Sequence, residues 1–445
     1  MSRSFVQANN KLRTGVSPFF FRLELNMTEF LLANGLRVLH EELPHLRSVA
    51  MGVWIGTGSM HELPDESGFS HCLEHMLFKG TEKRSASDIA KEMDRLGGNL
   101  NAFTAKDCTC FHTKTLGEDV EIAMDILADM VMNPTLETKH LELEKGVILE
   151  EIDMVEDYPE ELVHDVLTEK TWAGHPLSYP ILGTKENVGE IEQTKLKAFH
   201  KKFYHPQNTV LAVAGGISKE VLIEMTNRIF GLWDPVKFVK ANMSDAIFLP
   251  TFTMQKKKIE QTHLCIAYPG VNTEDHCVWA MSVMNNIVGG GMSSRLFQKI
   301  REDLGLVYSV YSFATSYYHG GLFSIYAASA PKKANDVLKY IAEELECMVT
   351  SKVPEEEFLR AKQQLRGGFM MSLDSTNGHM MNMGRNLVVS NRIQQVEEII
   401  NSIESVTIED VHQISRQVFT SNKRGFAGIG NTKLHEDSLD CFKMM

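Results

Sequence analysis

Residues 70–78 read Ser-His-Cys-Leu-Glu-His-Met-Leu-Phe, and their centre, from His71 to His75, has the pattern H-x-x-E-H. Positions i, i+3 and i+4 of a helix share one face, so His71, Glu74 and His75 would project together. Two imidazoles one turn apart can bind a single Zn²⁺, and a carboxylate beside them can accept a proton from water. The pentad is the inverted form of a metalloprotease helix. Because so short a motif also arises by chance, the prediction of a zinc site requires a third ligand.

A second predicted helix, residues 141–154, carries the candidates for that third ligand. It follows a break at Pro134, and Glu144 and Glu151 lie seven residues apart on it, about two turns, so they share a face. A buried carboxylate is rare unless it is paired or bound to a metal. Solvated surface glutamates are the ordinary alternative in so acidic a helix, and these residues alone leave the choice open.

Taken together, these segments resemble the pitrilysin-type zinc peptidases with the inverted motif, in particular the branch of the mitochondrial processing peptidase and its bacterial relatives. Two further segments carry the resemblance, namely Phe78-Lys79-Gly80-Thr81 and Gly97-Gly98 followed by Asn101-Ala102-Phe103-Thr104. The similarity extends over residues 28–430. It implies an α+β fold of two homologous domains, each a mostly antiparallel sheet packed against helices.

The resemblance also assigns roles at the centre of the site. The family's third zinc ligand is a glutamate on the second helix, at a spacing that Glu151 matches. One Zn²⁺ per chain would therefore be held by His71, His75 and Glu151. Glu74 would act as general base, and Glu144 would orient a ligand histidine.

Substrate contacts are implied on both sides of the metal. The strand that contains Asn101, Ala102 and Phe103 resembles the family's edge strand, to which a peptide adds as an extra strand. An ordinary internal strand is the alternative. Arg301 and Tyr308 match the arginine and tyrosine that relatives supply from the metal-free domain, although a surface arginine and a half-buried strand tyrosine would have the same spacing.

Composition excludes several classes of protein. The chain has 445 residues, enough for two or more domains, and a net charge of −13, which argues against nucleic acid as a partner. Its seven cysteines are scattered without a C-x-x-C motif, which predicts reduced thiols in a cytosol-like compartment. The sequence contains no run of 18 apolar residues, so no membrane span is predicted.

The N-terminal residues 1–26 fall outside the resemblance and form a non-homologous extension. They carry four basic residues against one acid, Glu24, as in a mitochondrial transit peptide, which would place the protein in the mitochondrial matrix. The interpretation favoured here is that translation starts at Met27, where the family-like sequence begins, and that the protein is cytoplasmic.

The remaining chain divides at residues 231–250, a stretch with little periodicity that contains Pro235 and Pro250 and is predicted to be a linker. Residues 27–230 would form the catalytic zinc-binding domain. Residues 251–445 would form a homologous, metal-free domain that grips substrate. A helix predicted at residues 283–300 would replace the zinc helix.

The predicted repeat has an offset of about 220 residues, judged from the similar runs that begin at Pro134 and Pro354. At that offset, the four positions of the site hold residues that cannot replace the zinc ligands, namely Gly291, Ser294, Arg295 and Met371. The run Gly289-Gly290-Gly291 lacks the lysine of a phosphate-binding loop. It is predicted to be a flexible helix entry, or the glycine-rich loop that relatives carry near substrate.

The sequence therefore predicts a zinc-dependent endopeptidase that hydrolyses small or unfolded polypeptides, most simply as a homodimer, with a heterodimer as the other possibility. A non-catalytic structural or substrate-binding subunit of the same fold is the main alternative, although such subunits typically lack part of the metal motif. A metalloenzyme acting on a different small substrate is a further alternative, which the length and the duplicated half disfavour.

Overall fold

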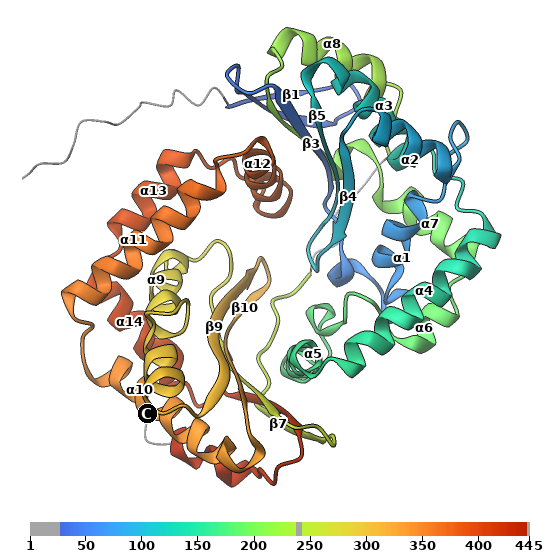
Figure 1. Ribbon diagram of the computed structural model, residues 1–445. Coiled ribbons are helices and arrows are strands. Elements are labelled where there is room, and N and C mark those ends of the chain that lie inside the picture. Colours follow the sequence, from blue (N-terminus) through green and yellow to red (C-terminus); the bar gives the residue numbers. More distant parts are fainter. Residues whose placement is uncertain (1–26, 237–242, 443–445) are drawn as a thin grey trace, which may run out of the picture.

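A computed structural model describes residues 27–236 and 243–442. The predicted N-terminal extension, residues 1–26, lies outside the described residues, as do positions 237–242 of the predicted linker. Two units built from sheets and helices face each other, one formed by the first half of the chain and one by the second (Figure 1).

The first half contains a six-stranded sheet in which β2 and β6 are the one parallel pair. Its strands, in spatial order, are β1 (Met27–Leu31), β2 (Arg37–Glu42), β6 (Thr209–Gly215), β3 (Ser48–Ile55), β5 (Thr109–Leu116) and β4 (Asn99–Thr104). The helices that cover one face of this sheet are α1 (Phe69–Leu77), α2 (Ala86–Arg95), α3 (Val120–Met132), α4 (Thr138–Asp157), α6 (Lys185–Gly189), α7 (Gln193–Phe203) and α8 (Lys219–Phe230). Strand β4 is therefore an edge, paired with β5 alone.

The second half repeats this arrangement around a five-stranded sheet. Its spatial order is β7 (Thr251–Lys256), β11 (Gly425–Gly430), β8 (Thr262–Pro269), β10 (Gly320–Ser329) and β9 (Val307–Tyr317). If β1 is set aside, the two orders match strand for strand, including one parallel pair in each, and β9 is the edge that corresponds to β4. The predicted α+β fold of two homologous domains is confirmed.

The helix that takes the topological place of α1 differs from the one predicted. The covering helices of the second half are α9 (Val278–Val288), the π-helix η6 (Phe297–Asp303), α10 (Ala334–Thr350), α11 (Glu355–Ser372), α13 (Val396–Ser405) and α14 (Ile408–Phe419). The prediction of a continuous helix at residues 283–300 is wrong, because α9 ends at Val288 and the three glycines that follow interrupt the helical run. Helix α9 contains no histidine or carboxylate.

Each half also lends one helix to the other half's sheet. Helix α5 (Pro159–Thr171) packs on β8 and β11, and α12 (Thr376–Ser390) packs on β3 and β6 (Figure 1). Each sheet thereby has helices on both faces, although α5 does not cover β9 and β10, and alternate residues of a strand contribute to different cores. Along β3, Val53 packs against the helices of its own half, whereas Trp54 packs against α12.

The contact between α12 and the first sheet is close and partly polar. A Cβ atom at Gly384 would lie 2.0 Å from Nε1 of Trp54, so glycine is needed for this approach. His379 on α12 lies 2.9 Å from a carboxylate oxygen of Glu41 on β2, and both side chains are buried. The two halves therefore share cores, although the assignment of residues 27–230 and 251–445 as catalytic and substrate-gripping domains stays a prediction.

The seven cysteines are all free thiols. Among the described helices, none is long and apolar enough to cross a lipid bilayer.

Candidate metal centre

Helix α1 is fixed at its first turn by a buried glutamate. Glu62 accepts the backbone N–H groups of Gly68 and Ser70, at 2.9 and 2.7 Å. These N–H groups have no partner within the helix, and negative charge is favourable at this end. Gly68 precedes the helix with φ +99°, a conformation that favours glycine. Burial raises the pKa of Glu62 to about 7. The helix that carries the H-x-x-E-H pentad therefore has a defined start.

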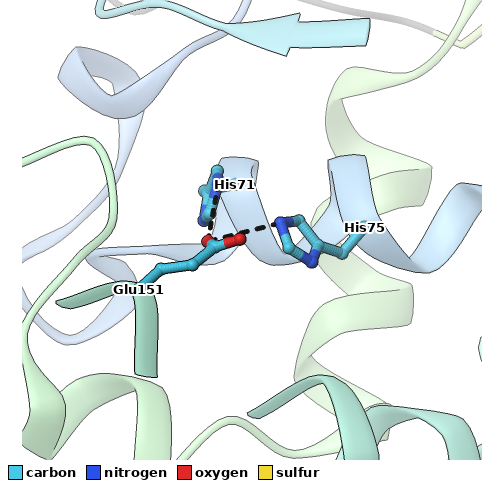
Figure 2. Close-up of side chains that lie close together, drawn as sticks. All are labelled: His71, His75 and Glu151. Carbon is cyan, nitrogen blue, oxygen red and sulfur yellow. Dashed lines mark ion pairs between the residues drawn. The ribbon is translucent and has the colours of Figure 1, made fainter. Parts of the chain in front are cut away.

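Three side chains from α1 and α4 converge (Figure 2). The Nε2 atoms of His71 and His75 lie 3.7 and 3.6 Å from one carboxylate oxygen of Glu151. All three ligand atoms lie within 4.8 Å of one another. Two ligands bound to one tetrahedral zinc ion at 2.0–2.1 Å would be separated by about 3.3 Å. The separations are too long for hydrogen bonds and fit a shared ion.

The chemistry of His71 also fits a metal ligand. Burial, together with the neighbouring His75, lowers the pKa of His71 to about 4, so its imidazole is neutral near pH 7 and keeps a free lone pair. Its Nδ1 atom is buried without a hydrogen-bond partner in the described part of the chain. An ion between α1 and α4 would bind the opposite nitrogen, Nε2, which lies 3.7 Å from Glu151, and the ring proton would then stay on Nδ1.

His75 is held by a carboxylate on the far side of its ring. Its Nδ1 lies 3.0 Å from Oε2 of Glu144, and Nζ of Lys79 lies 2.7 Å from the other oxygen of the same carboxylate. Glu144 is buried, and its carboxylate is placed to accept a hydrogen bond from Nδ1–H, which leaves Nε2 unprotonated and facing Glu151. The structure thus brings Glu144 to a histidine of the cluster, and the orienting role that the family resemblance implies for it stays a prediction.

Glu74 connects the cluster to the edge of the sheet. Oγ1 of Thr104, the last residue of β4, donates to Oε2 of Glu74 at 2.6 Å. Burial raises the pKa of Glu74 above its ordinary value. The predicted substrate residues Asn101, Ala102 and Phe103 all lie on this strand, which has no neighbour on its outer side within the described residues. A free sheet edge therefore lies beside Glu74.

Arg301 and Tyr308 lie together in the second half, but away from the cluster. Arg301 belongs to η6, and its guanidinium carbon lies 5.8 Å from the centre of the Tyr308 ring at the start of β9. Tyr308 is 74% exposed, so its hydroxyl is accessible to a ligand. Within residues 27–236 and 243–442, no hydrogen bond or ion pair joins either residue to α1 or α4.

The contacts above include residues to which sequence reasoning gave no role. Lys79 and Thr104 lie in segments that carry the family resemblance, and this position could have marked them as candidate site residues. Glu62 lies in a loop outside helix α1, and no residue pattern pointed to it. Its function becomes visible only when the loop folds beneath the helix.

Fold and site together define a class of protein: two repeated α+β halves, of which one carries a two-histidine, one-carboxylate cluster beside a sheet edge. Comparison with family models matches residues 37–185 to the insulinase family of peptidases, family M16, and residues 190–365 to the inactive domain of peptidase M16. The cluster lies wholly in the first of these two segments.

Relatives of similar length support the same conclusion. An uncharacterized zinc protease of Bacillus subtilis is 40% identical over 389 residues, which cover 87% of this chain and 95% of the relative. An uncharacterized zinc protease of Mycobacterium leprae is 38% identical over 408 residues, 89% of this chain and 90% of the relative. The chain belongs to peptidase family M16.

Solved structures show the same fold at lower identity. A protease from Helicobacter pylori superimposes with a TM-score of 0.85 at 20% identity, covering 91% of this chain and 99% of that one. A peptidase M16 inactive domain from Pseudomonas fluorescens superimposes with a TM-score of 0.86 at 23% identity, covering 93% and 99%.

The geometry generates a prediction about zinc binding. Glu151→Gln should lose stoichiometric zinc, because it removes the only anionic member of the cluster and leaves a weak amide ligand. Glu150→Gln, an exposed change on the same helix, is the matched control and should keep zinc. Metal content after dialysis and zinc titration calorimetry measure both. If Glu151→Gln binds zinc as tightly as the wild type, Glu151 is not a ligand and Glu144 becomes the candidate.

Proposed function

We propose that this chain is a zinc-dependent endopeptidase that hydrolyses small or unfolded polypeptides. The observation that carries the proposal is the convergence of His71, His75 and Glu151 next to a carboxylate that touches a free sheet edge. The names of the relatives as zinc proteases support it. In this proposal the cluster holds one zinc ion per chain.

The residues around the cluster divide the chemistry between them. Zinc, when bound, supplies a Lewis acid that lowers the pKa of water and polarises a carbonyl group. Glu144 keeps His75 oriented through its 3.0 Å contact with Nδ1, and Nζ of Lys79 holds the other carboxylate oxygen of Glu144 at 2.7 Å. His71 stays neutral because its surroundings lower its pKa.

Glu74 is proposed as the general base. Thr104 holds one of its carboxylate oxygens at 2.6 Å, which leaves the other oxygen to accept a proton from the attacking water and to pass it to the leaving amine. The raised pKa of Glu74 moves it toward the working pH, where a carboxylate is a more effective base. The same hydrogen bond keeps the base next to β4, where the scissile bond would lie.

Substrate is proposed to bind by adding a strand to the outer side of β4. The backbone of Asn101, Ala102 and Phe103 would pair with an extended peptide. Backbone pairing accepts many side chains, which fits a broad specificity, and it requires that the substrate be unfolded. A folded domain keeps its backbone groups paired and would be a poor substrate.

Arg301 and Tyr308 are proposed to complete the site from the metal-free half. The Tyr308 hydroxyl would donate to the oxyanion that forms on the scissile carbonyl, and Arg301 would bind a neighbouring substrate carbonyl. Since neither residue contacts the cluster, they would reach it when the two halves close, or from a partner chain in a dimer. A homodimer is the simplest assembly, and a heterodimer is the other.

A non-catalytic subunit remains the second candidate. The match of residues 190–365 to an inactive-domain model favours it for that segment. The cluster lies outside the matched segment and has all three metal-binding groups, which favours an enzyme. We further propose a cytoplasmic location, which the bacterial origin of the relatives supports over the mitochondrial matrix.

Glu74→Gln tests the proposed reaction directly. The variant should keep zinc, because Glu74 is not a ligand, but should lose peptidase activity by at least about 10²-fold, since general base catalysis contributes on that scale. Cleavage of a mixed peptide library, scored by mass spectrometry together with zinc content, measures both properties. Glu82→Gln, an exposed change beyond the same helix, is the control and should be fully active. Full activity in Glu74→Gln would remove this residue from the mechanism.

Tyr308→Phe tests the contribution of the second half. Loss of one oxyanion donor should lower kcat by about 10²–10³-fold, while zinc content and folding stay unchanged. Tyr318→Phe, a change at another exposed tyrosine of the same half, should have no effect. Mixing Glu74→Gln chains with Tyr308→Phe chains should restore part of the activity if Tyr308 acts on the partner's site. An unchanged kcat in Tyr308→Phe would refute the assignment.

A further inference from the structure

A cavity of about 340 Å³ lies between α5 and the part of the second sheet that α5 leaves uncovered. Helix α5 packs on β8 and β11, whereas the cavity reaches β10 and the edge strand β9. Aromatic side chains dominate its walls, namely Trp172, Tyr311, Phe313 and Tyr317. We call this cavity the aromatic pocket.

The register of β9 explains why these rings gather. Residues 311, 313, 315 and 317 alternate along the strand and therefore point to one face. Helix α5 packs on the same face of the sheet. The rings therefore extend the hydrophobic core between α5 and the sheet onto the part of the sheet that α5 does not cover. Each of the three β9 rings is only half-buried, so apolar surface is left open to a ligand.

Contacts from α5 hold the walls in place. The Tyr311 hydroxyl donates to Oε1 of Glu160 at 3.2 Å, and it also lies 3.2 Å from Nε2 of His164. The His164 ring packs edge-on against Phe313, with centroids 5.2 Å apart, and Trp172 packs edge-on against Tyr317 at 6.0 Å. A pocket with fixed walls discriminates between side chains by fit, because it does not collapse around small ones.

The one lysine among the pocket's lining residues connects the pocket to the proposed catalytic strand. Lys106 lies two residues beyond Thr104, the residue that donates to Glu74, in the turn that joins β4 to β5. The Cα atoms of Thr104 and Lys106 are therefore at most about 7 Å apart. The Lys106 ammonium donates to the carbonyl oxygen of Tyr179 at 2.6 Å and is thereby held in place. A peptide that continues past the end of β4 would reach the pocket within two or three residues.

We propose that the aromatic pocket is a specificity subsite that receives one aromatic side chain of the peptide substrate, two or three residues from the scissile bond. The walls supply ring-to-ring contact, and the Lys106 ammonium disfavours lysine and arginine in the same position. The proposal rests on the proposed peptidase function. It adds a preference that strand addition to β4 does not explain.

The test measures peptide binding separately from cleavage. Fluorescein-labelled, unstructured decapeptides of alanine and serine carry a single phenylalanine moved through each position, with arginine and alanine series for comparison. Fluorescence anisotropy of the Glu74→Gln chain measures binding without turnover, and kcat/KM of the wild type measures cleavage. Phenylalanine at one position should improve both by at least about 10-fold over alanine, with arginine no better than alanine.

Thr315→Trp provides the structural control, because residue 315 lies on the same face of β9 and a large ring there fills the pocket. It should abolish the preference for phenylalanine, while Thr315→Val, of similar size, should keep it. Lys106→Met should make arginine acceptable at the same position.

The outcomes separate the two proposals. Equal binding of the phenylalanine and alanine peptides to the Glu74→Gln chain, or a preference that survives Thr315→Trp, would overturn the subsite. A wild type that binds the phenylalanine peptides selectively but cleaves none of them would refute the peptidase function and leave the subsite standing.

Discussion

Glu62 lies beneath the first turn of α1 and accepts two of its backbone N–H groups. This contact sets the start and the direction of the helix. The spacing of the pentad then puts His71, Glu74 and His75 on one face of it. Because the helix is fixed, His71 and His75 face α4. There Glu151 lies near both histidines, and Glu144, two turns away on the same helix, contacts His75. A shift of one residue in the start of α1 would rotate the histidines by about 100° and separate the ligand atoms.

The arrangement of the two halves gives this centre its surroundings. Duplication placed an edge strand in each half, β4 beside the cluster and β9 beside the aromatic pocket. Exchange of α5 and α12 places helices on the second face of each sheet, and α5 follows directly after α4, which carries Glu151. Helix α5, which follows Glu151 in the chain, is therefore also a wall of the aromatic pocket. The candidate metal ligands, the sheet edge and the pocket are joined by short stretches of chain.

Much of the centre could be predicted from the sequence, because its geometry is local. Helical spacing alone puts His71, Glu74 and His75 on one face, and it puts Glu144 and Glu151 on one face of a second helix. The docking of those two helices came from family resemblance and not from the residues. The assignment of Glu151 over Glu144 to the ligand position likewise needed the resemblance, since both glutamates share a helix face.

Other features could not be predicted, since they depend on long-range packing. The role of Glu62 depends on a loop folding under a helix, and the aromatic pocket joins residues of α5 and β9 that are far apart in the chain. The helix predicted at residues 283–300 failed for a local reason: apolar periodicity continued across Gly289, Gly290 and Gly291, where the helix propensity of glycine ends α9. Sheet order, and with it the free edge at β4, has no local signature at all.

The central claim is that two histidines and Glu151 hold one zinc ion. Anomalous diffraction at the zinc absorption edge, on crystals of the protein purified without chelator, tests it most directly. The account predicts one strong peak per chain, about 2.0–2.2 Å from Nε2 of His71, Nε2 of His75 and a carboxylate oxygen of Glu151. A peak instead at Asp275, His276 and Cys277, the other described group able to approach one ion, would contradict it. So would a zinc-loaded crystal without density between α1 and α4.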